Sequence, residues 1–340
     1  MNKMNKMNKG KILLAASLFL FAHSAQAKVD ICIFDLLGKA GESYKLMEDW
    51  LLASKNWNAD VGLKIVADEA QAEREFRAGN CDGVYMTSIR ARAFNKFAGS
   101  IDALGGVPSN AIAQKAISYA LDQRNSKRLV GRLEGQVYEV AGIGQLGAAY
   151  IFVKDRNINT VEKIAKKKFA VLGHDAAQRI MVQRINAKPV ASEISNFVSK
   201  FNNGQADIVA APAYAYRPLE IYKGMGPNGA MINFPVVNVT ADLIIRPDKF
   251  PQDFAAKSRQ WFLKQLPRSM AMVQRLEAGI PAKLRIQLSS EDRTAYQRLL
   301  REGRIDLTRQ GIYDETMMRV LKRARCTVER TNFECSLSGE

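Results

Sequence analysis

The sequence predicts an α/β protein of two lobes, each with a mixed but mostly parallel sheet, joined by hinge strands and followed by long C-terminal helices. Three observations favour this fold class. Short apolar strands alternate with helices in both halves, a nine-residue pattern occurs once in each half, and one further strand with long helices follows the second half. Alternating strands and helices form parallel sheets through right-handed crossovers. We therefore expect two lobes with a cleft between them.

Residues 1–27 have the features of a secretory signal peptide. MNKMNKMNKGK carries four lysines and no acid, the apolar run ILLAASLFLFA spans 11 residues, and Ala25-Gln26-Ala27 fits a cleavage site. The apolar run is too short for a bilayer, which takes about 20 residues. We expect cleavage after Ala27 and a soluble mature protein in the periplasm. The net charge of +16 then falls by the four lysines to +12.

The first lobe is predicted to comprise residues 28–135 and about 236–260. KVDICIFDLLG, VGLKIVAD and CDGVYMTS are its expected strands, with GESYKLMEDWLLASKNW and EAQAEREFRAG as helices between them. Residues 108–135 are expected to be helical. The strand VVNVTADLIIRP, near the end of the chain, is expected to cross back from the second lobe.

The second lobe is predicted to comprise residues 136–235 and about 261–310. AAYIFVKD, KFAVLG, AKPVAS and ADIVAAP are its strands, with TVEKIAKK, DAAQRIMVQRIN and EISNFVSKFNNG as helices. A long helix is expected from about Gln252 to Ala278, which Pro267 should kink or divide. Residues 311–340 should form a C-terminal helix and a disulfide hairpin.

The pattern F-x-x-G-x-x-D-x-V occurs as FRAGNCDGV from Phe76 and as FNNGQADIV from Phe201. In each copy the Gly is expected to end a helix in the left-handed conformation, where a residue without Cβ is favoured. Asp82 and Asp207 precede their strands, so we assign them to structure and not to ligand binding. The alternative to one unit used twice is that any helix-to-strand turn converges on such a pattern.

Four cysteines remain after the signal segment, and an even number in an oxidising compartment favours two disulfides. Of the three possible pairings we favour Cys32–Cys81 and Cys326–Cys335. The first would join two strands of the first lobe, and the second would close a short C-terminal hairpin, CTVERTNFEC.

With these features in place, the chain resembles the periplasmic solute-binding proteins of TRAP-type (tripartite ATP-independent) transporters. The resemblance rests on the signal segment, the mature length, the order of the lobes, the repeated F-x-x-G-x-x-D unit, and VVNVTADLIIRPDKF followed by a long helix. More narrowly, the chain is similar to the AdeT-type exported group, whose members are labelled as components of RND efflux linked to aminoglycoside resistance. An RND pump needs many membrane spans and its adaptor a long coiled-coil hairpin, and the sequence predicts neither.

The resemblance implies a periplasmic-binding-protein fold of type II and the capture of a small polar ligand by hinge closure. It also implies a membrane permease as partner. Members of the TRAP-type family usually carry an Arg in a strand of the second lobe, after a Lys-rich turn, which forks onto the ligand's carboxylate. The corresponding run here is KKKFAVLG, and Ala170 stands at the position of that Arg. An organic acid as ligand is therefore in question.

Ligands of open α/β sheets bind beyond the carboxyl ends of the strands, so polar residues there are the candidates. For His174 and Asp175, which follow KFAVLG, the alternative is an exposed turn in which Asp175 caps a helix. The tyrosines of AYAYRP could equally serve packing. Asn238 and Thr240 could line the hinge. The candidate ligand-binding residues are Asp35, Tyr85, Thr87, Ser88, Arg90, His174, Asp175, Tyr214, Tyr216, Arg217, Asn238 and Thr240.

Catalysis, cofactors, metals and nucleic acid are not expected. AGIGQLG has the G-x-G-x-x-G spacing, but a strand follows it where a nucleotide site needs a helix, so we expect a flexible turn. We find no nucleophile paired with a base, which disfavours a secreted hydrolase, and no paired-His metal motif. The C-terminal arginines are predicted to form a solvated helix face, with an anionic docking patch as the alternative.

We therefore expect a monomeric binding protein that is not an enzyme. The alternative function is a ligand-binding sensor or an accessory to drug efflux, without a transport role of its own. Lobe closure together with a transporter gene nearby would favour solute binding for transport. A ligand-responsive partner that is not a permease would favour the sensor or accessory function.

Overall fold

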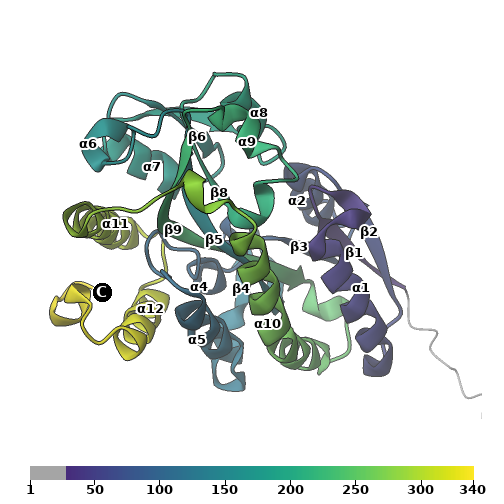
Figure 1. Cartoon of the computed structure of the whole chain (residues 1–340). Helices are drawn as coiled ribbons and strands as arrows, with labels where there is room; N and C mark the ends of the chain where they lie inside the picture. Colours follow the sequence, from purple (N-terminus) through teal and green to yellow (C-terminus); the bar gives the residue numbers. More distant parts are fainter. Residues whose placement is uncertain (1–27) are drawn as a thin grey trace, which may run out of the picture.

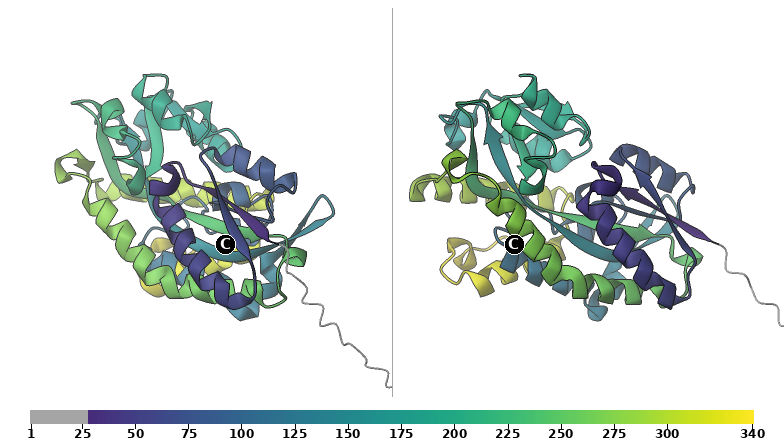
Figure 2. Two further views of the ribbon diagram at one scale, coloured as in Figure 1. Left: turned by 90° about the vertical axis from the view of Figure 1, so that its right-hand side faces the viewer. Right: turned by 45° about the vertical axis from the view of Figure 1, so that its right-hand side comes forward.

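The computed structural model describes residues 28–340, so the predicted signal peptide lies outside the described residues. A ten-stranded sheet runs through the molecule in the order β2-β1-β3-β9-β5-β8-β6-β7, with β4 beside β5 and β10 beside β9 (Figure 1). Helices flank the sheet, and the two lobes lie side by side with long strands running from one into the other (Figure 2). The predicted two-lobed α/β fold is confirmed. The lobe boundaries given above stay a prediction.

Each lobe has the same three-stranded parallel unit. In lobe I, β1 lies between β2 and β3, and in lobe II, β6 lies between β7 and β8. The strands are β1 (Val29–Phe34), β2 (Val61–Val66), β3 (Gly83–Thr87), β4 (Val130–Leu133), β5 (Gln136–Val153), β6 (Lys168–Leu172), β7 (Lys188–Ser192), β8 (Ile208–Pro212), β9 (Ala230–Ile245) and β10 (Arg285–Ile286).

The three longest helices of the described residues, with 25, 20 and 14 residues, come last in the chain. The helices are α1 (Glu42–Ser54), α2 (Glu69–Arg77), α3 (Ser88–Ala91), α4 (Lys96–Gly99), α5 (Asn110–Leu121), α6 (Val161–Ile164), α7 (Ala176–Arg184), α8 (Phe197–Asn202), α9 (Ile221–Met225), α10 (Phe254–Ala278), α11 (Ser290–Arg309) and α12 (Glu315–Val328). Pro267 does not divide α10, which stays continuous and curves along its length (Figure 1).

Strands β5 and β9 form an antiparallel ribbon that joins the lobes. Their register runs from Glu139 opposite Ile245 to Val153 opposite Ala230, with irregularities along the way. The ribbon corrects two expectations. AGIGQLG lies inside β5 and is not a flexible turn, and residues 130–133, expected to be helical, form β4.

The glycines of AGIGQLG serve close packing. A Cβ at Gly142 would come within 2.1 Å of the Phe262 ring on α10, and a Cβ at Gly144 would come within 2.1 Å of the Tyr85 hydroxyl. The absence of side chains therefore lets α10 and β3 approach the ribbon.

The two copies of the repeated pattern make the same contacts. Gly79 and Gly204 end α2 and α8 with φ of +81° and +78°. The Asp82 carboxylate accepts a hydrogen bond from the backbone N–H of Asp30 at 2.9 Å, and Asp207 accepts one from Lys168 at 2.8 Å. In each lobe the Asp therefore ties the entrance of the third strand to the central strand. The structural role predicted for both aspartates is confirmed.

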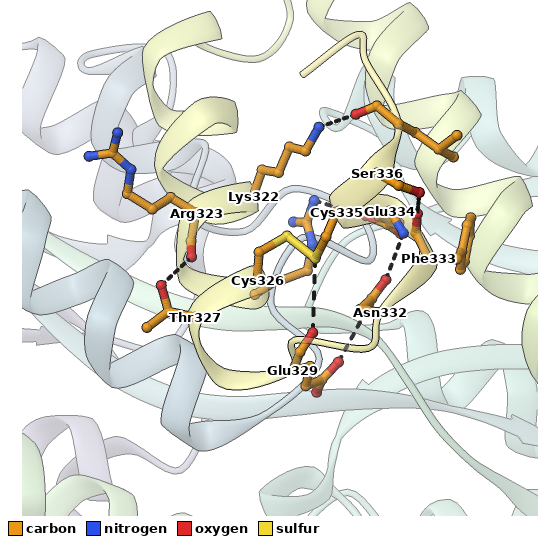
Figure 3. Close-up of a disulfide and its surroundings, with 12 residues drawn as sticks. Lys322, Arg323, Cys326, Thr327, Glu329, Asn332, Phe333, Glu334, Cys335 and Ser336 are labelled. Atoms are coloured by element: carbon orange, nitrogen blue, oxygen red, sulfur yellow. Dashed lines mark hydrogen bonds and ion pairs between the residues drawn. A yellow bond between two sulfur atoms is a disulfide. The ribbon is translucent and has the colours of Figure 1, made fainter.

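Both predicted disulfides are present. Cys32–Cys81 links β1 to the entrance of β3 with a Cα–Cα distance of 5.8 Å. Cys326–Cys335 links the last turn of α12 to a 3-10 turn, with a Cα–Cα distance of 5.6 Å (Figure 3). The segment after α12 therefore folds back onto the end of that helix. Among residues 28–340, no helix combines the length and the hydropathy needed to cross a bilayer.

Candidate functional site

Two adjoining cavities lie where the lobes meet. Their free volumes are similar, and they differ in the extent of their walls. The larger, which has the longer wall, has a free volume of about 130 Å³ and takes its walls from the lobe II sheet, from α7 and α11, and from lobe I residues such as Ile89. The smaller, which has the shorter wall, has a free volume of about 140 Å³ and lies beyond β1 and β3, against α10. The two share Leu36, Thr87, Tyr214, Ala215 and Leu219. Residues from both lobes therefore enclose one divided space.

Three of the predicted site residues line this space: Asp35, Thr87 and Tyr214. Asp35 follows β1, and its carboxylate accepts the backbone N–H of Leu37 at 2.9 Å and of Tyr44 at 3.0 Å. Burial raises the pKa of Asp35, and these two hydrogen bonds oppose the rise. Thr87 ends β3 and is 4% exposed, and its hydroxyl oxygen has no hydrogen-bond partner among the described residues.

Arg90 lies at the lobe boundary but binds protein carboxylates. Its Nε donates to Glu69 at 3.0 Å and its Nη1 to Glu73 at 2.8 Å, both on α2. Its Nη2 crosses to lobe II and donates to Glu193 at 2.8 Å and to His174 Nδ1 at 2.9 Å. The guanidinium is thereby occupied by the protein itself, and it ties the lobes together.

His174 and Asp175 belong to the same boundary and do not line either cavity. The Arg92 guanidinium of lobe I lies 3.4 Å from the Asp175 carboxylate, which also accepts the N–H of Ala177 at the start of α7. Asp175 is therefore the predicted helix cap and also an ion pair between the lobes. Burial and the neighbouring Arg90 lower the pKa of His174 to about 4.

We expect acid to weaken the fold through His174. A histidine with a pKa of about 6.5 in the unfolded chain and about 4 in the folded one contributes stability that is present above pH 6.5. This contribution is lost as the pH falls from about 6.5 to 4, and we expect it to reach about 3 kcal/mol. Arg90, Arg92, Glu73, Asp175 and Glu193 face or neighbour the ring.

The measurement is the free energy of unfolding of wild type and His174→Gln at several pH values. The difference between the two should shrink from pH 7 to pH 4. A difference that stays constant over this range would contradict the assignment.

Ser88 and Thr240 are part of a fully buried network and not of a cavity wall. The Thr240 hydroxyl bonds Asp102 at 2.6 Å and Ser88 at 2.7 Å, and Ser88 donates in turn to Asp242. Burial raises the pKa of Asp242 to about 7. These contacts fasten α3 to β9 and leave neither hydroxyl for a ligand.

Of the four remaining candidates, three pack or hydrogen-bond within the protein and one is exposed. Tyr85 is fully buried and stacks on Phe262, and Tyr216 stacks on Phe152 with a centroid distance of 6.0 Å. Asn238 exchanges two side-chain hydrogen bonds, of 2.6 and 3.0 Å, with Gln145 across the β5–β9 ribbon. Arg217 is exposed and lines neither cavity.

Most of the cavity wall was not predicted, because it consists of apolar residues that resemble core in the sequence. Ala170 is the exception, since its position was singled out, and it does line the larger cavity. The apolar residues that the prediction missed include Leu36, Ile89, Phe169, Ile194, Leu219 and Leu300.

Comparison with known proteins agrees with this architecture. The model of the family "Solute-binding protein AdeT 1/2" matches residues 50–340. The probable solute-binding protein AdeT1 of Acinetobacter baumannii is 41% identical over 308 residues, which cover 91% of this chain and all of that protein.

Solved structures share the fold at low identity. The TRAP periplasmic solute-binding protein of Desulfovibrio salexigens, with bound orotic acid, superposes with a TM-score of 0.71 at 13% identity, over 88% of this chain and 99% of its own. The corresponding protein of Haemophilus influenzae, with bound L-gulonate, gives 0.68 at 11% identity, over 87% and 99%. The two-lobed fold is thus that of TRAP solute-binding proteins, and the chain itself belongs to the AdeT 1/2 family of solute-binding proteins.

Proposed function

We propose that this solute-binding protein works in the periplasm, as a monomer released from its signal peptide by cleavage after Ala27. It captures a small molecule between its lobes and presents the closed complex to a membrane permease. No bond is broken in this cycle. The observation that carries the proposal is the divided cavity, because residues of both lobes enclose it at the end of the sheet where such folds bind ligands.

Closure follows from the contacts at the lobe boundary. A ligand that touches both lobes stabilises the closed arrangement by its difference in affinity for the two states. Arg90 with Glu193, and Arg92 with Asp175, add contacts that exist only where the lobes meet. The efflux-accessory function gains no support from this geometry, and the family relationship favours solute binding.

A thermal-shift screen of ligand-stripped protein tests the proposal. The panel comprises organic acids, amino acids, polyamines, apolar amines and aminoglycosides. A compound that binds should raise the melting temperature in proportion to ln(1 + [L]/Kd). We expect Leu219→Trp, which fills the space where the two cavities join, to weaken the binding of any hit at least about tenfold.

Leu52→Trp is the matched control, because Leu52 is 62% exposed on α1 and outside both cavities. It should leave binding unchanged. A panel without a single hit, or a hit that Leu219→Trp leaves unaffected, would argue against ligand capture in this space.

A further inference from the structure

Within residues 28–340, the walls of the divided cavity carry acidic side chains but no basic ones. No Lys, Arg or His side chain lines either part of it. The larger part has no charged residue at all, and the smaller has only Asp35 and Glu42. Among the described residues, the Lys45 ammonium pairs with Glu42 at 3.3 Å, and Arg90 and Arg92 are bound to Glu and Asp side chains at the lobe boundary. The site thus has an apolar compartment and an acidic one.

The larger compartment suits an apolar group. Its volume is about 130 Å³, and apart from Thr87, Gln178 and two tyrosines its walls are aliphatic or aromatic or consist of alanine and proline. An apolar protein cavity of roughly 150 Å³ stays dry and binds benzene. One ring or a branched alkyl group therefore fits.

The smaller compartment suits a hydrogen-bond donor. Each carboxylate oxygen of Asp35 accepts one backbone N–H and can accept another bond. Thr87 belongs to the walls of both compartments, and its hydroxyl is buried without a partner among the described residues. Glu42 adds a second acidic side chain to the same wall, but it is half-exposed and pairs with Lys45 at 3.3 Å, so Asp35 is the carboxylate without a cation within the described part of the chain.

Among the described residues, a ligand carboxylate would find no cation in the walls of either compartment. A charge transferred into such a space without a counter-ion loses several kcal/mol of hydration that nothing replaces. Ala170, at the position where the resemblance predicted an Arg, supplies only a methyl group to the wall. The adjoining Asp35 would repel an anion further.

We propose that the ligand is an organic amine with an apolar body. The body occupies the larger compartment, and the ammonium group lies in the smaller one, where it donates to Asp35 and Thr87. This inference rests on the proposed function, since it names the ligand class of the same site. It also separates this chain from neighbours that hold orotic acid or gulonate.

Three probes with one body and different head groups test the ligand class by calorimetry at pH 7: 2-phenylethylamine, 2-phenylethanol and 3-phenylpropionate. We expect the amine to bind at least about tenfold more tightly than the alcohol, and the carboxylate to bind most weakly. Asp35→Asn should lower the affinity for the amine to that for the alcohol. Asp60→Asn, at an exposed aspartate outside both cavities, is the matched control and should change nothing.

A second variant, Ala170→Arg, tests the ligand class independently if Asp35→Asn fails to fold. Ala170→Arg should raise the affinity for 3-phenylpropionate and lower that for 2-phenylethylamine. An alcohol that binds as tightly as the amine, a carboxylate that binds most tightly, or no binding of any probe would overturn the inference. If another compound of the screening panel binds, solute capture stands and only the amine assignment fails. If nothing binds, both fail.

Discussion

Replacing Arg90 by Met should lower the free energy of unfolding by about 3–5 kcal/mol, the cost of breaking a buried ion pair from one side. The Glu69 and Arg90 side chains are 2% and 6% exposed, so loss of the guanidinium leaves a buried carboxylate with no cation beside it. Burial already raises the pKa of Glu69, and the guanidinium opposes the rise. Without Arg90 the pKa of Glu69 should therefore rise further.

Denaturant unfolding at pH 7 measures this loss, and Arg217→Met is the matched control. Arg217 is exposed, and within residues 28–340 its side chain makes one weak hydrogen bond, of 3.5 Å to the Gly279 carbonyl. We expect its replacement to change stability by less than about 0.5 kcal/mol and to leave ligand binding intact. A cost below about 1 kcal/mol for Arg90→Met would mean that the network adds no net stability.

Replacing Arg304 by Met should also cost about 3–5 kcal/mol, for a reason specific to the end of the chain. Arg304 on α11 is fully buried and donates to the Leu104 carbonyl at 2.9 Å and to Glu334 at 2.8 Å. Its Nε also bonds Glu340, the last residue. Without Arg304, both acids would depend on Arg325 alone, which is itself buried.

The control for this variant lies on the neighbouring helix. Arg319→Met removes an exposed i,i+4 pair with Glu315 on α12, and we expect it to cost less than about 0.5 kcal/mol. Thermal unfolding followed by circular dichroism separates the two variants. Equal melting temperatures would contradict the view that the C-terminal residues are anchored by Arg304.

The repeated units of the fold were predictable because local rules specify them. Apolar strands alternate with amphipathic helices, and a glycine with positive φ ends α2 and α8 alike. The β5–β9 ribbon was not predictable. Its residues in β5 read as a glycine-rich turn, and only the packing of Phe262 and Tyr85 explains why glycine stands inside a strand.

The predicted site residues and the wall of the divided cavity agree only in part, and the reason is again physical. Of the polar residues predicted at strand ends, three line the cavity: Asp35, Thr87 and Tyr214. Arg90, Ser88 and Asn238 have partners more than 80 positions away in the sequence, so their engagement is invisible to local patterns. Apolar wall residues such as Ile89 and Leu219 are of the same types as core residues, so the sequence does not distinguish the two.

The β5–β9 ribbon has a consequence for how tightly any ligand is held. Since the two strands run continuously between the lobes, opening must twist a hydrogen-bonded ladder instead of rotating about loose loops. The Gln145–Asn238 pair adds a side-chain link across that ladder, and the register irregularities around it interrupt the regular pairing. The stiffness of the ribbon therefore affects how easily the lobes open. A softer or stiffer ribbon would change the ligand's residence time without altering any atom that the ligand touches.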